Sequence, residues 1–183
     1  MIFRGVGLLF LAATVASSST PTYKTFFTNP STQLTGIGDI NSGICSYFQR
    51  IIPGTRLDIA LYQWDLDFNG VDSVATCLVS ALEAAGGQAR ARIVLDPNNN
   101  DRNCTSFRTL QAAQAKGLLT YHFAHVWQAG GKVNHTKMHN KFYAFESISG
   151  ASAAVLVSSG NIKNSQLYQG KVSNSSFHYL YFE

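Results

Sequence analysis

The sequence predicts an α/β fold, and three observations support this prediction. The chain has 183 residues, of which 45% are hydrophobic and 13% charged, a composition that builds a buried core. Some segments repeat apolar residues every second position and others at a helical period. The two kinds of segment alternate, which is typical of an α/β sandwich with a mixed, largely parallel central sheet flanked by helices.

The first elements are a strand over residues 23–27 and a helix over residues 37–52, which Pro53-Gly54 is expected to end. Residues 56–64 alternate apolar and polar side chains and are predicted to form a strand. A second helix is expected over residues 71–85, with Gly86-Gly87 as its stop.

The later elements continue the alternation. A strand is predicted over residues 90–96, a helix over 106–116 and a strand over 118–122. Two further strands, over residues 137–145 and 153–157, are joined by a link of hairpin length. Ligands of such sheets usually bind beyond the carboxyl ends of the strands.

Residues 1–18 are predicted to be a signal peptide. Arg4 precedes an apolar run of about eleven residues, and small residues suited to cleavage follow it. A membrane-spanning helix is the alternative, but it needs about 20 apolar residues. We therefore expect a secreted, extracellular protein with no transmembrane anchor after cleavage.

The three cysteines, Cys45, Cys77 and Cys104, fit an oxidising compartment with one disulfide and one cysteine left over. The pairing stays open. Charge is distributed unevenly: residues 1–101 carry a net −2 and residues 102–183 a net +6. The second part of the chain is therefore expected to meet an anion.

Histidine and lysine alternate in the segment HTKMHNK. In an extended backbone His135, Lys137, His139 and Lys141 would point to one face. Like charges repel there, so an anion such as phosphate is the expected ligand, although an exposed basic strand edge is an alternative. A metal bound by His135 and His139 is disfavoured because Lys137 lies between them.

The longer pattern is His139-Asn-Lys141, four residues and Glu146, followed by Ser158-Ser159-Gly160-Asn161 after the next strand. It resembles the HxKxxxxD and GSxN signature of the phospholipase D superfamily, with Glu146 in place of Asp and Ser158 in place of Gly. The upstream strands and helix also resemble that family. The resemblance implies a phospholipase D-like domain over residues 22–170 that hydrolyses phosphodiesters without a metal or other cofactor.

The same resemblance implies a role for each matching residue. His139 would be the nucleophile, since an imidazole can attack phosphorus and form a phosphoramidate that water opens. Lys141, Ser159 and Asn161 would bind the phosphate, with His135 as a neighbour. Lys141 and Glu146, which occupies the acid position of the motif, would join His139 as catalytic residues. The implied substrate is a phospholipid head-group ester. A secreted endonuclease, or an inactive phosphate-binding homologue, is the alternative.

Members of this superfamily use two such motifs in one active site, and this chain has one. The expected partner is therefore a second copy in a homodimer or a second half-site. Residues 171–183 are expected to be an atypical tail. Its start, Lys171-Val172-Ser173, fits translation through a splice donor, so the tail is interpreted as non-native sequence.

Overall fold

The structure is a computed structural model that describes residues 22–27, 39–65, 74–97, 102–124, 128–129, 132–133, 138–158, 162–163 and 176–182. Its helices are α1 (Asp39–Phe48), α2 (Val74–Ala84) and α3 (Thr105–Ala115). Its strands are β1 (Thr22–Phe27), β2 (Ile51–Leu61), β3 (Trp64–Asp65), β4 (Arg90–Leu95), β5 (Leu119–Phe123), β6 (Gln128–Ala129), β7 (Lys132–Val133), β8 (Lys141–Ile148), β9 (Ala151–Ser158), β10 (Ile162–Lys163) and β11 (Ser176–Phe182).

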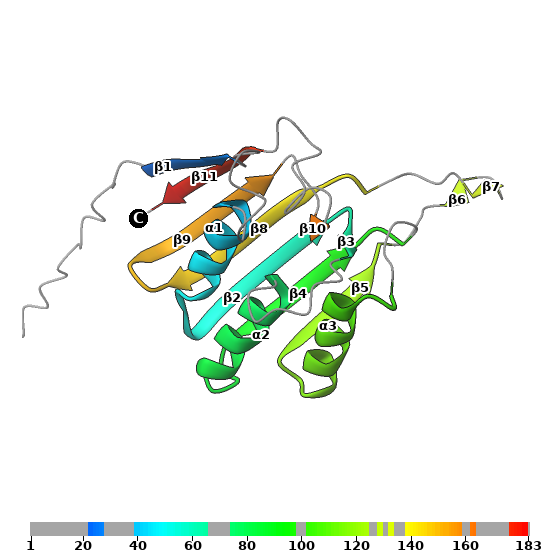
Figure 1. Cartoon of the computed structure of the whole chain (residues 1–183), viewed down its shortest axis with the longest axis horizontal. Coiled ribbons are helices and arrows are strands. Elements are labelled where there is room, and N and C mark those ends of the chain that lie inside the picture. The colour runs from blue at the N-terminus through cyan, green and yellow to red at the C-terminus, as the bar shows by residue number, and fades with distance from the viewer. Residues whose placement is uncertain are drawn as a thin grey trace, which may run out of the picture.

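Seven of these strands form one sheet in the order β1-β11-β9-β8-β2-β4-β5 (Figure 1). The predicted α/β fold with a mixed sheet is confirmed. The parallel part is smaller than predicted, because within the described strands of this sheet the parallel neighbours are β2 with β4 and β4 with β5. The crossovers through α2 and α3 make those strands parallel, whereas β8 and β9 are antiparallel neighbours joined by a tight hairpin.

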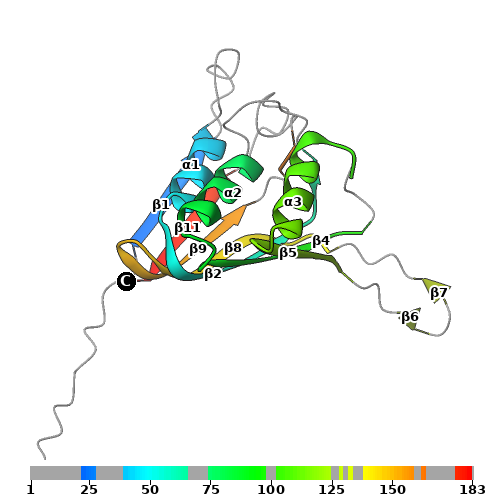
Figure 2. The same ribbon diagram turned by 90° about the horizontal axis from the view of Figure 1, so that it is seen from below.

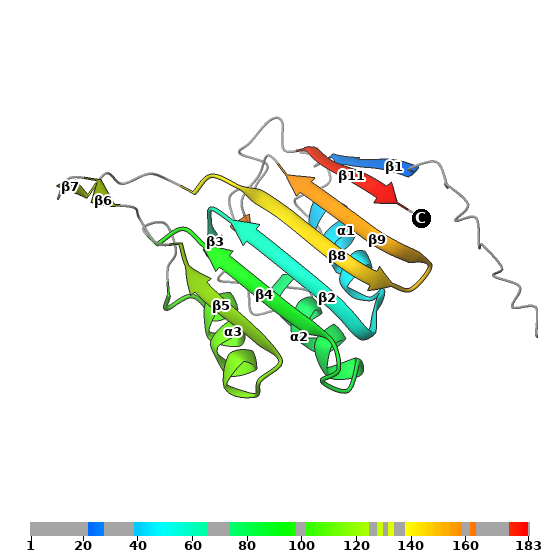
Figure 3. The same ribbon diagram turned by 180° about the vertical axis from the view of Figure 1, so that it is seen from behind.

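All three helices lie on one face of the sheet (Figure 2), and the view from behind shows the other face with no helix over it (Figure 3). The burial pattern of strand β4 shows the same difference between the two faces. Its residues Ala91, Ile93 and Leu95 are buried, whereas the alternating residues Arg90 and Arg92 are exposed. A parallel strand covered on both sides would be apolar throughout. Among the described residues, helices therefore flank one face and not both.

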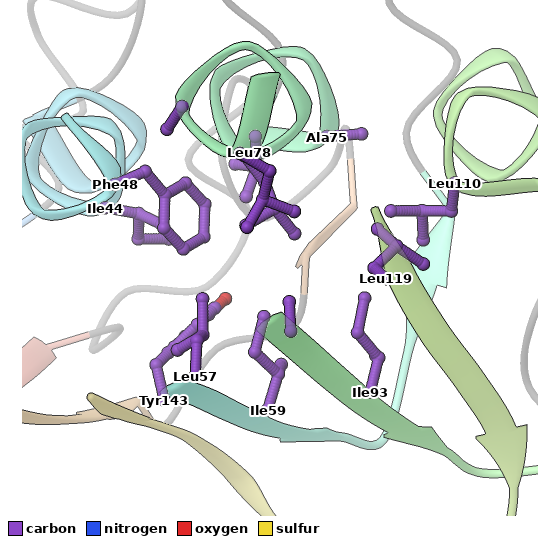
Figure 4. Packing of buried hydrophobic residues seen from close by; sticks show 14 of the residues in the cluster. Ile44, Phe48, Leu57, Ile59, Ala75, Leu78, Ile93, Leu110, Leu119 and Tyr143 are labelled. Atoms are coloured by element: carbon purple, nitrogen blue, oxygen red, sulfur yellow. The ribbon is translucent and has the colours of Figure 1, made fainter. Parts of the chain in front are cut away.

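The core fills the space between the helices and the covered face (Figure 4). Each helix contributes side chains at the spacing of one helical face, as Val74, Leu78 and Leu82 do in α2. The sheet contributes every second residue. Figure 4 labels core residues from the helices and from the strands: Ile44, Phe48, Leu57, Ile59, Ala75, Leu78, Ile93, Leu110, Leu119 and Tyr143. No described helix has the length and apolar character needed to cross a bilayer.

The cysteines behave as the composition predicted, and the structure settles the pairing. Cys45 on α1 and Cys77 on α2 form a disulfide that joins two neighbouring helices. Cys104 is buried at the amino end of α3 and forms no disulfide, and its sulfur accepts a hydrogen bond from the backbone N–H of Phe107. That contact serves as the cap of the helix.

Two predicted boundaries are wrong. The first helix ends at Phe48, and Pro53-Gly54 lies inside β2, where the pairing with β8 shifts register between Ile51 and Arg56. Gly54 has a positive φ of 91°, which a bulge accommodates as readily as a helix end does. Strand β8 begins at Lys141 and not at residue 137. Residues 138–140 are described but belong to no strand.

The structure also describes part of the segment that is expected to be an atypical tail. Strand β11 lies within the tail 171–183, and it is paired with β1 on one side and β9 on the other. The tail therefore contributes a strand to the main sheet. The predicted signal peptide at residues 1–18 lies outside the described residues, and so do residues 171–175, which hold the segment interpreted as a splice donor.

Candidate active site

The candidate site lies where β2 and β4 end and β8 begins. Leu61, the last residue of β2, is paired with Lys141, the first residue of β8. Leu61 is also paired with Leu95 at the end of the parallel strand β4. Polar residues follow these ends directly, as is usual for ligand sites of α/β sheets.

Lys141 places its ammonium group against His139. Its Nζ lies 3.2 Å from Nδ1 and 3.2 Å from Nε2 of the imidazole, and it donates to the backbone carbonyl of His139 at 3.1 Å. An ammonium group can only donate, so the acceptor in this contact is an imidazole nitrogen that carries a free lone pair. His139 itself is exposed, so the ring is open to a substrate.

Lys141 is unusual because a cation of this kind is rarely buried. Its residue is 6% exposed, and burial lowers the pKa of its ammonium group. Within the ranges that the structure describes, no carboxylate forms an ion pair with Lys141. A phosphate oxygen arriving from solvent would supply the missing negative charge.

Tyr62 packs against both of these residues. Its ring centroid lies 4.7 Å from that of His139, and the Lys141 Nζ lies 5.5 Å from the Tyr62 ring centroid. The backbone N–H of Tyr62 donates to the carbonyl of Asn140 at 2.9 Å. Tyr62 therefore holds the segment that carries His139 by its side chain and its backbone.

Asp96 fixes the same segment from β4. It is fully buried directly after Leu95, and its Oδ2 accepts a hydrogen bond of 3.0 Å from the backbone N–H of Met138, the residue before His139. The motif pattern did not point to Tyr62 or Asp96. The available signal was their position, since each polar residue directly follows an apolar strand.

Ser158 marks the place where the neighbouring strand reaches the site. It is the last residue of β9 and is 9% exposed, and it follows Val157, which is paired with Phe142 at the start of β8. Ile162 then pairs with Trp64, two residues after Tyr62. Of the predicted phosphate ligands, Ser159, Asn161 and His135 lie outside the described residues, so their roles stay predictions.

Glu146 does not join His139 and Lys141. It is five residues beyond Lys141 on the same strand, about 16 Å away, and an odd separation along a strand sends the two side chains to opposite faces. Glu146 is exposed, and its nearest ion pair is with Arg56 at 3.7 Å. The structure thus places Glu146 apart from His139 and Lys141, and its catalytic role stays a prediction. The described residues contain no group of three His, Cys, Asp or Glu side chains that could hold a metal.

No protein-family model and no curated protein matches the sequence. Among solved structures, yeast tyrosyl-DNA phosphodiesterase is similar at 11% identity with a TM-score of 0.48, over 88% of this chain and 32% of that chain. A mutant form of that yeast enzyme is similar at 12% identity with a TM-score of 0.47, over 88% of this chain and 31% of that chain. This chain thus spans about a third of the length of those structures.

Proposed function

We propose that this chain hydrolyses phosphodiesters without a metal, through a phosphohistidine intermediate on His139. The observation that carries the proposal is the buried Lys141 ammonium, held 3.2 Å from the imidazole nitrogens of an exposed histidine with no ion-paired carboxylate among the described residues. A nucleophile and a cation for the phosphate thus lie side by side.

The reaction follows from these two groups. An imidazole nitrogen of His139 attacks phosphorus, the P–N bond forms, and the bond to the leaving oxygen breaks. The Lys141 ammonium binds a non-bridging oxygen and offsets the charge that grows on it. Water then attacks phosphorus and breaks the P–N bond, which releases a phosphomonoester and restores the imidazole. The released alcohol needs a proton, which a second motif would donate.

A second copy of the chain, or a separate half-site, would supply that motif. The sequence resemblance to two-motif enzymes supports this part of the proposal. A homodimer predicts activity that rises more steeply than linearly with protein concentration, because only the dimer would hold both histidines.

The proposed substrate is a phospholipid head-group ester, and the proposed location is outside the cell. The apolar stretch within residues 1–18 supports secretion, as does the Cys45–Cys77 disulfide, which persists in oxidising compartments. A secreted nuclease of the same chemistry is the alternative, since the basic second part of the chain would suit a nucleic-acid backbone as well.

The first experiment is hydrolysis of bis(p-nitrophenyl) phosphate in EDTA by the full chain, over a range of protein concentrations. We expect EDTA-resistant activity that falls at least about a thousandfold in His139→Ala. The matched control is His122→Ala, which removes an exposed histidine from β5 and should leave the activity unchanged. Acid-labile ³¹P signal on the wild type, absent from His139→Ala, would identify the intermediate.

Two further arms separate the substrate classes. Phosphatidylcholine vesicles and single-stranded DNA are compared at the same enzyme concentration, and a steep fall of DNA cleavage with salt would indicate phosphate contacts along a polymer. Equal activity in wild type and His139→Ala would exclude His139 as the nucleophile. Phosphate binding without turnover in any arm would identify an inactive phosphate-binding homologue.

A further inference from the structure

The face of the sheet without helices, called the open face below, carries rows of side chains with different chemistry. Strand partners at alternate positions point to the same side, so the register defines each row. The first row, called the apolar row, crosses five strands. It contains Val157, Phe142, Ala60 and Val94, and it ends at His122 on β5. Two residues further toward the amino end of β4, the middle row contains Asp58 and Arg92. The third row, the cationic row, contains Glu146, Arg56 and Arg90.

Two members of the apolar row are exposed more than large apolar residues usually are. Val94 and Val157 are 37% and 42% exposed, and both are among the three large hydrophobic residues exposed in the described part of the chain. A cavity of about 330 Å³ is lined here by Ala60, Val94 and Phe142, with Thr120 and His122 at the β5 side. Cavities of this size bind small molecules, which bury apolar surface in them.

The cationic row has more positive charge than its carboxylates balance. Arg56 is the direct strand partner of Arg90, a like-charged pair that costs stability. The contact of Arg56 with Glu146 is long and exposed, and the Arg90 guanidinium donates to the backbone carbonyls of Gly87 and Ala89. Within the described ranges, no carboxylate pairs with Arg90.

The middle row lies between the apolar row and the cationic row, and it does not neutralise the excess positive charge of the cationic row. Asp58 accepts two hydrogen bonds of 2.6 Å from Arg92, so this carboxylate is already engaged. A second hollow of about 180 Å³ is lined by Arg56, Arg90, Arg92, Leu57 and Asp58. It shares Asp58 and Arg92 with the larger cavity, so the apolar and cationic regions adjoin.

We propose that the open face binds a single-chain anionic amphiphile. Its anionic head group lies between Arg56 and Arg90, and its alkyl chain runs in the strand direction over the larger cavity and ends on the apolar row. Four residues along a strand separate the cationic row from the apolar row, a distance of about 13 Å that an extended chain of about ten carbons spans. Phosphate and carboxylate head groups both fit two guanidinium groups. The proposal is independent of the activity at His139, since Lys141 points to the covered face.

The test is a titration of the full chain, labelled with ¹³C in valine methyl groups, with decyl phosphate below its micelle concentration. We expect the Val94 and Val157 methyl signals to shift with saturation. The double variant R56Q/R90Q should bind at least about tenfold more weakly, because two charge-assisted contacts are lost. Val94→Thr keeps the shape and strand propensity of the side chain, and it should weaken binding by a few fold. Decanoate replaces decyl phosphate in a second arm to distinguish the two head groups.

Control variants and a control ligand show whether the binding belongs to the open face. Arg108→Gln removes an exposed cation from α3, on the covered side, and should bind decyl phosphate like the wild type. In His139→Ala the valine shifts should persist, which separates this site from the proposed active site. Binding of uncharged decyl maltoside as tight as that of decyl phosphate would overturn the proposal. So would the absence of valine shifts, or shifts that follow protein concentration instead of ligand, which would assign the face to a second copy.

Discussion

Two cations of the main sheet, Lys141 and Arg92, have opposite surroundings. Lys141 is 6% exposed and its ammonium faces the His139 ring, whereas the Arg92 side chain is 72% exposed on the open face. Arg92 has a carboxylate partner in Asp58, whose hydrogen bonds and charge raise the pKa of the guanidinium. In the described ranges no carboxylate pairs with Lys141, and burial lowers its pKa.

This difference indicates which of the two cations is more informative about function. An exposed and paired arginine contributes little to stability, and it reveals little about function. A buried ammonium whose acceptors are neutral is less stabilised than one paired with a carboxylate, because the hydrogen bonds to His139 replace only part of its lost hydration. Lys141 therefore supports the proposed phosphate site more strongly than the basic composition does.

The largest effect is expected when the buried cation is removed. Lys141→Met should lower kcat/KM for bis(p-nitrophenyl) phosphate at least about a hundredfold, because the developing charge loses its partner. The same change should raise the free energy of unfolding by about 1 kcal/mol, measured by urea denaturation, since it replaces a buried charge that has no carboxylate partner among the described residues by an apolar side chain.

Arg92→Met is the matched control, because it makes the same replacement at the exposed and paired position. Its activity should equal that of the wild type, and its unfolding midpoint at physiological salt should not change measurably. A Lys141→Met protein that keeps its activity and loses stability would contradict the functional interpretation of Lys141.

A smaller effect is expected at the aromatic neighbour of both site residues. Tyr62→Leu should lower kcat about tenfold with little change in KM, because the imidazole loses the ring that orients it. Tyr62→Phe keeps the ring and should stay close to wild type. The histidine ring protons in an NMR spectrum provide a readout independent of activity, since Tyr62→Leu should move the His139 signals and Tyr62→Phe should not. Unchanged His139 signals in Tyr62→Leu would refute the contact.

A smaller effect again is expected for Asp96→Ala. It should lower activity several fold and the free energy of unfolding by about 2 kcal/mol, because the partly buried Met138 N–H loses its acceptor. Asp96→Asn retains an acceptor oxygen and should recover much of both losses. Urea denaturation and the chromogenic assay measure the two effects. If alanine and asparagine were equally damaging, the negative charge would matter more than the hydrogen bond.

The smallest effect concerns pH. Because the pKa of Lys141 is lowered in the folded chain, the unfolded chain holds this proton up to a higher pH. Between the lowered pKa and the ordinary value of 10.5, the unfolded state binds more protons, so the free energy of unfolding should rise with pH. The difference between wild type and Lys141→Met, measured by urea denaturation from pH 7 to 10, isolates this contribution. A difference that is constant with pH would show that the pKa is not shifted.

Elements with a clear period were predictable from the sequence. The helix α2 and the strand β4 lie within the predicted ranges, because their buried side chains recur at the spacing of one face. The α1 boundary was not predictable, since Pro-Gly ends helices and also occupies strand bulges. The strand bulge is stabilised here by the pairing of β2 with β8, which brings together residues about 90 positions apart.

The site was predictable in part for the same reason. The contact of His139 with Lys141 joins residues two apart, and the motif contains both. Asp96 holds Met138 across 42 residues of sequence, a contact that no local pattern encodes. The fixed spacing of a motif also carries no information on the pleat of a strand, which is why Glu146 was grouped with residues on the opposite face.

The buried thiol of Cys104 is a natural probe of local opening at the start of α3. The sulfur is the cap of α3 and the residue is 4% exposed, so a thiol reagent reaches it only when the first turn of that helix detaches. Cys45 and Cys77 do not compete for the reagent, because they are bonded to each other. The labelling rate under native conditions therefore reports the opening of the first turn of α3, without an engineered cysteine.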